Sequence, residues 1–265
     1  MPLRKLLVVL SACISASLGQ NLTPYAGNGQ IVRSGAISRG FVAQVLDVAG
    51  NPIPGATVNW LVTTGIGPTL AISQSSTDLE GKASTLFVAE TLVSGQRIKT
   101  VKVTASTTIQ GTVRTFEFSA VILASNVTVS AEVSSILSPT NPIGAGTTLA
   151  NAVSAQISSN AGGVTEPLAG VALFADPEGR DGPLASCANN TLSDNDGRVS
   201  CNLVAGGRIA AGFVRVSAGG LAENTFISWR YPLRVVGGPP ASLIVIQGDG
   251  QSGVSGDLVT SEDQW

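Results

Sequence analysis

The residues of this sequence that could do chemistry are acidic side chains in glycine-containing segments and a pair of cysteines. Asp47 stands in VLDVAGNPIPGATVNW and Asp78 in STDLEGKASTL. A catalytic carboxylate normally needs a second group poised opposite it. Histidine, the usual general base at neutral pH, is absent from all 265 residues. We therefore predict no catalytic residue and no enzyme, and we expect both aspartates to hydrogen-bond turn backbone, where Asp is favoured.

Two acidic segments have the composition of a hard-cation site. They are DPEGRDG at 176–182 and DNDG at 194–197. Calcium is held by several closely spaced carboxylate and carbonyl oxygens, but neither segment completes the twelve-residue loop of an EF-hand. DNDG also aligns with DLEG at 78–81, where a turn recurs. The sequence favours hairpin turns, with calcium kept as the alternative, and it predicts no cofactor.

The two cysteines beyond the N-terminal segment are Cys187 and Cys201. An even pair in an exported chain favours a disulfide, and two buried thiols are the alternative. On the loop-entropy treatment a disulfide closing a loop of this size stabilises the fold by about 3 kcal/mol.

The first nineteen residues resemble an export signal. Arg4 and Lys5 precede the apolar run LLVVLSACISASLG, and Ser17 and Gly19 occupy the −3 and −1 positions for cleavage before Gln20. The run is too short for a permanent membrane span. We predict a signal peptide at 1–19 and a secreted or cell-surface location.

A second interpretation of this segment is lipidation. LSAC at 10–13 is similar to a bacterial lipobox, in which the cysteine, here Cys13, would carry the lipid. Its apolar lead is very short, so we expect cleavage instead.

The amino-acid composition favours one fold class, and the net charge excludes some classes of partner. The chain is 43% hydrophobic and 12% charged, with 31 glycines and 13 prolines, which favours packed strands joined by tight turns. The formal net charge of −2 does not attract nucleic acid or an anionic membrane. We expect partners of another kind.

The chain repeats itself. GNGQIVRSG at 27–35 recurs as GDGQSGVSG at 248–256, and the glycines of TDLEG and SDNDG lie 116 positions apart. A glycine-containing turn followed by Pro-x-x-Gly also occurs at 52–55 and again at 167–170. These landmarks predict one unit at 20–125, a second at 126–236, and the start of a third at 237–265.

Within each unit, apolar and polar residues alternate along short segments. GFVAQVLD, ATVNWLVTTG and KTVKVTAS each place apolar side chains on one face only. Several such strands in about a hundred residues, separated by Gly, Pro, Asn and Asp, are typical of an antiparallel β-sandwich. We expect the four aromatic residues Trp60, Phe116, Phe118 and Trp229 to pack in the core or at a sheet edge, with a sugar-binding platform as the alternative.

These motifs resemble the bacterial immunoglobulin-like domain of group 1, the Big-1 or invasin/intimin-type repeat. The resemblance is carried by Gly27, Gly29, Gln30, Val45, Asp47, Gly50, Asn51, Pro52, Pro54, Gly55, Val58, Trp60, Thr77, Asp78, Gly81 and Ala83. The second unit departs from the pattern, with Ser159 in place of the aspartate and no tryptophan near Ala175.

The resemblance implies tandem immunoglobulin-like sandwiches that act as a structural spacer or adhesive stalk at the bacterial surface. The partners that it implies are an unknown surface protein or glycan, together with adjacent repeats of the same chain. Carboxypeptidase-regulatory-like domains share D-x-x-G-x-P-x-P-G, so a regulatory-like or carbohydrate-binding accessory module of a larger exported protein is the alternative.

Overall fold

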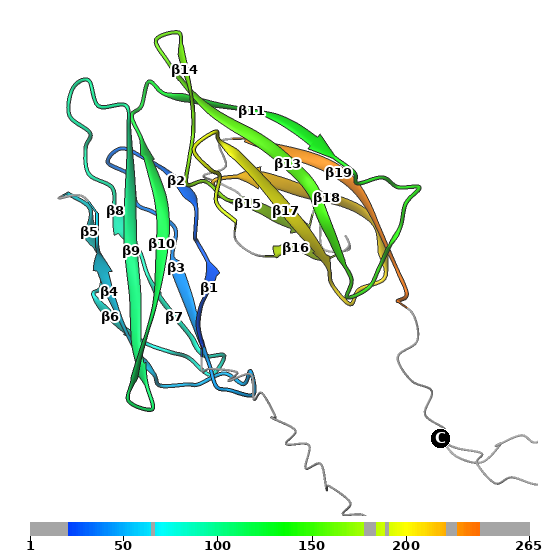
Figure 1. The fold of residues 1–265 in the computed structure, drawn as a ribbon, viewed down its shortest axis with the longest axis horizontal. Coiled ribbons are helices and arrows are strands. Elements are labelled where there is room, and N and C mark those ends of the chain that lie inside the picture. Colours follow the sequence, from blue (N-terminus) through cyan, green and yellow to red (C-terminus); the bar gives the residue numbers. More distant parts are fainter. Residues whose placement is uncertain (1–20, 65–66, 178–183, 189–190, 221–226, 239–265) are drawn as a thin grey trace, which may run out of the picture.

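The computed structural model describes residues 21–64, 67–177, 184–188, 191–220 and 227–238 (Figure 1). The predicted signal peptide 1–19 with Cys13 lies outside these residues, as does the predicted third repeat beyond 238. Within the described ranges, no helix is long and apolar enough to cross a membrane.

The first domain packs one sheet of order β1-β3-β7 against another of order β2-β10-β9-β4-β6, with a short β5-β8 pair beside them. Its strands are β1 (Asn21–Ala26), β2 (Gln30–Arg33), β3 (Phe41–Leu46), β4 (Thr57–Val62), β5 (Thr69–Leu70), β6 (Gln74–Ser76), β7 (Lys82–Thr85), β8 (Phe87–Val88), β9 (Ile98–Ile109) and β10 (Thr112–Leu123).

The second domain packs a sheet of order β11-β13-β17-β16, with β14 added to β13, against a sheet of order β12-β19-β18-β15. Its strands are β11 (Thr128–Ser135), β12 (Ile143–Gly144), β13 (Thr148–Ala161), β14 (Val164–Pro167), β15 (Leu173–Pro177), β16 (Ala185–Ala188), β17 (Arg198–Ala205), β18 (Ala210–Ala218) and β19 (Ile227–Val236). In each domain one short strand, β2 or β12, joins the last long strand in parallel, and the other strand pairs are antiparallel. The predicted all-β class, with two immunoglobulin-like sandwiches in tandem, is confirmed.

The alternating apolar side chains of the sequence form the first core. Along β3 the side chains of Phe41, Ala43 and Val45 are fully buried, while their neighbours are partly exposed. This period of two follows from the pleat, which turns successive side chains to opposite faces. The Phe118 ring lies 5.2 Å from that of Phe41 and 5.8 Å from that of Trp60, centroid to centroid.

Trp60 and Phe118 are buried inside the first sandwich, whereas Phe116 and Trp229 are partly buried and pack against the cores. Phe116 contacts Phe118 edge to face, at 4.9 Å between centroids. Trp229 packs against the second core, which is built mainly of Val, Leu, Ile and Ala. The contacts of these four side chains with the two cores favour packing, and the sugar-binding alternative for them stays a prediction.

The two sandwiches are inclined to each other and approach where β10 leads into β11 (Figure 1). The connection is short, and Arg33 of β2 fixes it: its Nη1 donates to the carbonyl oxygens of Ala124, at 2.9 Å, and Val127, at 2.6 Å. Burial lowers the pKa of the Arg33 guanidinium, which nevertheless stays protonated because its ordinary value is so high. A partly buried charge with two carbonyl acceptors therefore stabilises this connection.

Candidate functional site: the junction between the domains

Asp47, the first candidate acid, closes a turn. Its Oδ1 accepts hydrogen bonds of 2.8 Å from the amides of Ala49 and Asn51, and its Oδ2 accepts one of 3.1 Å from the Asn51 side chain. The Asn51 side chain is the main cause that lowers the pKa of Asp47, followed by the Asn51 backbone amide. Gly50 completes the turn at φ +85°, a conformation that favours glycine.

The same turn occurs at Asp78 and Asp194. Oδ1 of Asp78 accepts from the amides two and four residues later at 2.9 Å each, and Oδ1 of Asp194 accepts from the equivalent amides at 3.0 and 2.8 Å. Gly81 and Gly197 then take φ of +71° and +75°. DNDG is thus a copy of the DLEG turn. In the described part of the chain, no three Cys, Asp or Glu side chains gather as metal ligands.

A buried hydroxyl ties the turns of each domain together. Thr77 Oγ1 accepts from the amide of Ala56 at 2.8 Å and donates to the Ile53 carbonyl at 2.7 Å. In the second domain Ser193 Oγ accepts from the Val171 amide at 2.9 Å and donates to the Leu168 carbonyl at 2.7 Å. The repetition seen in the sequence is therefore also a repetition of hydrogen bonds.

The remaining residues of the proline-containing signature shape the link between β3 and β4. Pro52 and Pro54 are exposed, and Gly55 takes φ +73°. Trp60 is 3% exposed, and its Nε1 donates to Ser75 Oγ at 2.8 Å. A buried indole needs such a partner. The contacts of these residues are those of a turn and a core.

Gln30 organises the start of the first domain. Its side chain is 2% exposed, and its Nε2 donates to the carbonyls of Gly27, at 3.0 Å, and Arg39, at 3.2 Å. The Arg39 amide returns a 2.8 Å bond to Gln30 Oε1. Gly27 is required because a Cβ there would lie 2.3 Å from the Gly40 carbonyl oxygen. One buried amide thus holds two segments of backbone in place.

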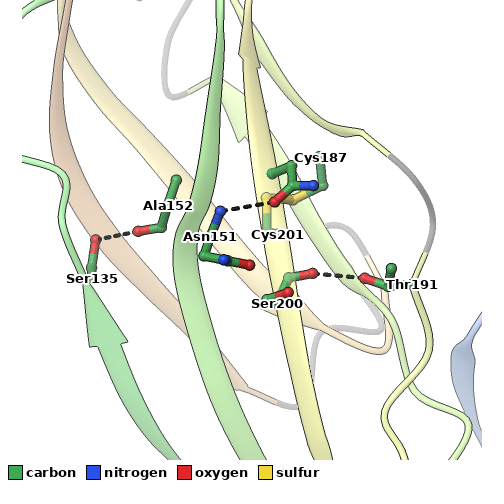
Figure 2. Close-up of a disulfide and its surroundings, with 8 residues drawn as sticks. Ser135, Asn151, Ala152, Cys187, Thr191, Ser200 and Cys201 are labelled. Carbon is green, nitrogen blue, oxygen red and sulfur yellow. Dashed lines mark hydrogen bonds between the residues drawn. A yellow bond between two sulfur atoms is a disulfide. The ribbon is translucent and has the colours of Figure 1, made fainter.

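Cys187 and Cys201 form a disulfide with 5.1 Å between their Cα atoms (Figure 2). The bond ties the edge strand β16 to β17, where Cys201 is buried in the second core. Beside it the pairing of β13 with β17 slips, and the Asn151 amide donates to Asn202 Oδ1 at 2.8 Å. The disulfide secures an edge that four residues of pairing alone would hold weakly.

The junction joins the domains through main-chain hydrogen bonds. The amide of Ala172 donates to the Gly29 carbonyl at 2.9 Å, the amide of Gly219 donates to Ala172 at 2.9 Å, and the amide of Ile31 donates to Gly219 at 2.7 Å. A Cβ on Gly29 would come within 2.4 Å of the Ala172 nitrogen. Gly29, a signature residue of the first unit, therefore has its role at the contact with the second.

The hydrophobic cores meet at the same place. Ile31, 2% exposed, belongs to the core of the second domain, together with Val121 and Leu123 from β10. The next residue, Val32, belongs to the core of the first domain. Opposite faces of β2 thus serve the two domains. Sequence reasoning missed Ile31, Ala172 and Gly219, and only Gly29 carried a signal.

No family model matches the chain, and no curated protein matches it. Among solved structures, the chain is similar to the D0-D1 domain of intimin, at 12% identity and a TM-score of 0.31, over 81% of this chain and 97% of that one. It is also similar to FdeC, an Escherichia coli adhesin, at 17% identity and a TM-score of 0.26, over 82% of this chain and 64% of that one.

A further similar structure is invasin, described as a bacterial integrin-binding protein, at 19% identity and a TM-score of 0.29. That match covers 80% of this chain and 39% of invasin. Likeness at these identities and TM-scores carries no argument about what this chain binds.

Proposed function

We propose that this chain is a non-catalytic, exported immunoglobulin-like repeat protein that acts as a spacer and adhesive stalk at the bacterial cell surface. The observation that carries the proposal is the junction, where backbone hydrogen bonds through Gly29, Ala172 and Gly219 join the two sandwiches. A linker without such contacts would let the domains move independently, which is the default for neighbouring domains.

The chemistry of the described residues supports a structural role. The carboxylates of Asp47, Asp78 and Asp194 accept hydrogen bonds from turn amides. The sequence has no histidine to act as a base. A rigid unit of this kind is better suited to a mechanical role, holding its ends apart, than to catalytic turnover.

The bend between the domains defines what such a spacer does. Because the sandwiches are inclined to each other (Figure 1), an array would change direction at each junction of this type. The shared core around Ile31 keeps that change fixed. The proposed stalk therefore holds its outer end at a set angle as well as a set distance.

Two measurements test the proposal. Expression of the full chain in a bacterium, followed by N-terminal sequencing of the exported product, is expected to show cleavage before Gln20. Intact cells are expected to expose the chain to added protease. A chain that keeps Met1 and stays protected inside the cell would contradict the export that the function needs.

Adhesion is tested on the same cells. A non-adherent strain that displays the chain is expected to bind epithelial monolayers more than the same strain displaying an unrelated β-sandwich of similar length. Equal binding would contradict the adhesive part of the function, and the spacer part would then be tested by solution scattering of the purified chain.

A further inference from the structure

A cleft lies between the domains, where β1 and the β2–β3 link face β15 and β16. Its volume is about 310 Å³, which falls in the range of about 300–1,000 Å³ typical of ligand sites. Both domains line it: Tyr25, Gly27 and Arg39 come from the first, and Phe174, Cys187 and Gly220 from the second. Domain interfaces are a preferred location for such sites.

Both walls of the cleft are held rigidly. On one wall, the Gln30 side chain binds the backbone of Gly27 and Arg39 through three hydrogen bonds of 2.8 to 3.2 Å. On the other, the disulfide fixes Cys187 to β17. A site that exists before its ligand arrives loses less conformational entropy on binding.

The junction sets the distance between the walls. The amide of Ile31 donates to Gly219 at 2.7 Å, immediately before the lining residue Gly220. Gly219 has φ +76°, and a Cβ there would lie 2.4 Å from the Ile31 side chain. The backbones approach this closely because glycine is present, so the cleft width depends on the domain contact.

The residues that line the cleft indicate the class of ligand it could bind. Apolar surface prevails, and Tyr25 and Phe174 supply two aromatic rings, of which Tyr25 is 53% exposed. Arg39 is the only charged residue among the twelve that line the cleft. In the described part of the chain, no acidic side chain pairs with Arg39. An arginine fork matches a carboxylate with two parallel hydrogen bonds.

The Tyr25 ring also contacts a cation, Lys82, which is not among the residues that line the cleft. Lys82 Nζ lies 3.8 Å from the Tyr25 ring centroid. Its hydrogen bond to Glu80, followed by its interaction with Tyr25, raises the pKa of Lys82, so it stays protonated. Glu80 partly offsets the charge of Lys82. Among the described residues, no carboxylate forms an ion pair with Arg39, which lines the cleft.

We propose that this cleft binds a carboxylate-bearing sugar, with its carboxylate on Arg39 and an apolar ring face against Tyr25 or Phe174. This ligand complements both properties of the lining, because its apolar ring face matches the aromatic rings and its one negative charge matches Arg39. A neutral sugar would leave the arginine desolvated without a partner, which is costly. A peptide with an acidic side chain is the competing occupant.

This inference gives a ligand class for the proposed adhesive function. It rests on that function in one respect, because it expects the ligand to be found outside the cell. The test is separate from that function because it uses purified protein in solution. Failure of sugar binding would leave export and the rigid junction standing, and failure of export would leave the chemistry of the cleft unchanged.

The experiment is calorimetric titration of the mature chain, residues 20–265, with glucuronic acid and N-acetylneuraminic acid. Glucose and acetate serve as the uncharged and ring-free controls, and an Asp-containing tripeptide represents the competing occupant. We expect both acidic sugars to bind with one site per chain, at least tenfold more tightly than each control. No binding of either acidic sugar, or equal binding of glucose, acetate or the tripeptide, would overturn the assignment.

Two variants locate the site. Arg39→Gln is expected to weaken binding at least tenfold, because charge-assisted hydrogen bonds are lost. The matched control is Arg198→Gln, which removes an exposed arginine of β17 that lies beside Asp196 and outside the cleft. Both variants are expected to keep the wild-type unfolding midpoint. Equal loss in both, or none in Arg39→Gln, would overturn the proposal.

Discussion

The amide of Ala172 donates a 2.9 Å hydrogen bond to the carbonyl oxygen of Gly29, so the second sandwich is bonded to a residue that the sequence pattern assigned to the first. The neighbouring bonds through Gly219 and Ile31 extend this contact. Two domains joined in this way are expected to unfold and move as coupled units, which can be tested at single residues.

The first prediction concerns Gly29→Ala. Gly29 has φ +76°, and a Cβ would lie within 2.6 Å of Ala172 and Leu192. We expect a loss in the free energy of unfolding of about 1 kcal/mol from backbone strain and about 2 kcal/mol more from overpacking. Urea unfolding measures the total, and solution scattering is expected to show a wider distribution of domain orientations.

Gly55→Ala is the matched control. Its φ is +73°, almost the same as that of Gly29, but a Cβ there would meet nothing within 4 Å. It is therefore expected to lose only the strain contribution of about 1 kcal/mol, with unchanged scattering. Equal losses in the two variants would show that Gly29 is needed for its dihedral angle and not for the contact between domains.

The second prediction separates the two cores at neighbouring residues. Ile31 is buried in the second core and Val32 in the first. Ile31→Ala is expected to cost about 2–5 kcal/mol and to increase hydrogen exchange mainly in β13 and β17. Val32→Ala is expected to increase exchange mainly in β3 and β9. The same exchange pattern in both variants would contradict the assignment of one residue to each domain.

The sequence predicted elements whose signal is local. Alternation along 41–46, 57–62 and 99–106 identified β3, β4 and most of β9, because the period of two can be read from neighbouring residues alone. The Asp-x-x-Gly turn was also readable, since its aspartate and glycine are only three positions apart and the aspartate carboxylate accepts from the amides on either side of the glycine.

The junction could not be predicted, because it depends on contacts between residues that are distant in the sequence. Ile31 and Val32 are adjacent apolar residues, and alternation says that they face opposite sides of a strand without saying which core lies on each side. Gly29 is explained by Ala172, which is distant in the sequence. The strands β5 and β8 have two residues each, too few for any period to show.

The third prediction concerns the hydroxyl that ties two turns. Thr77→Val keeps the shape but leaves the Ala56 amide and the Ile53 carbonyl without their partner. The expected loss is about 1–3 kcal/mol, the cost of unsatisfied buried polar groups. Ser193→Ala should lose a similar amount in the second domain. Thr108→Val, which alters an exposed hydroxyl of β9, is expected to stay within about 0.5 kcal/mol of wild type.

The fourth prediction concerns the disulfide. Reduction, or the double substitution of Cys187 and Cys201 by alanine, is expected to lower the free energy of unfolding of the second domain by about 3 kcal/mol, because a loop with a sequence separation of 14 is no longer closed. Hydrogen exchange in β16 should rise, and exchange in β9 should not. Mass spectrometry of the exported chain that finds two free thiols before reduction would contradict this role.

The last prediction concerns the pKa of Asp47. Hydrogen bonds from the Asn51 side chain and backbone hold it below the ordinary value of 3.8. Since the folded-state pKa is depressed, Asp47 contributes stability that is present above the pKa of the unfolded chain and is lost as the pH falls through the folded value. NMR titration of the Asp47 carboxyl carbon should give a midpoint below 3.8, and Asp47→Asn should flatten the loss of stability in acid. A general acid that works near neutral pH needs the opposite shift, so a midpoint above 3.8 would reopen a catalytic role for Asp47.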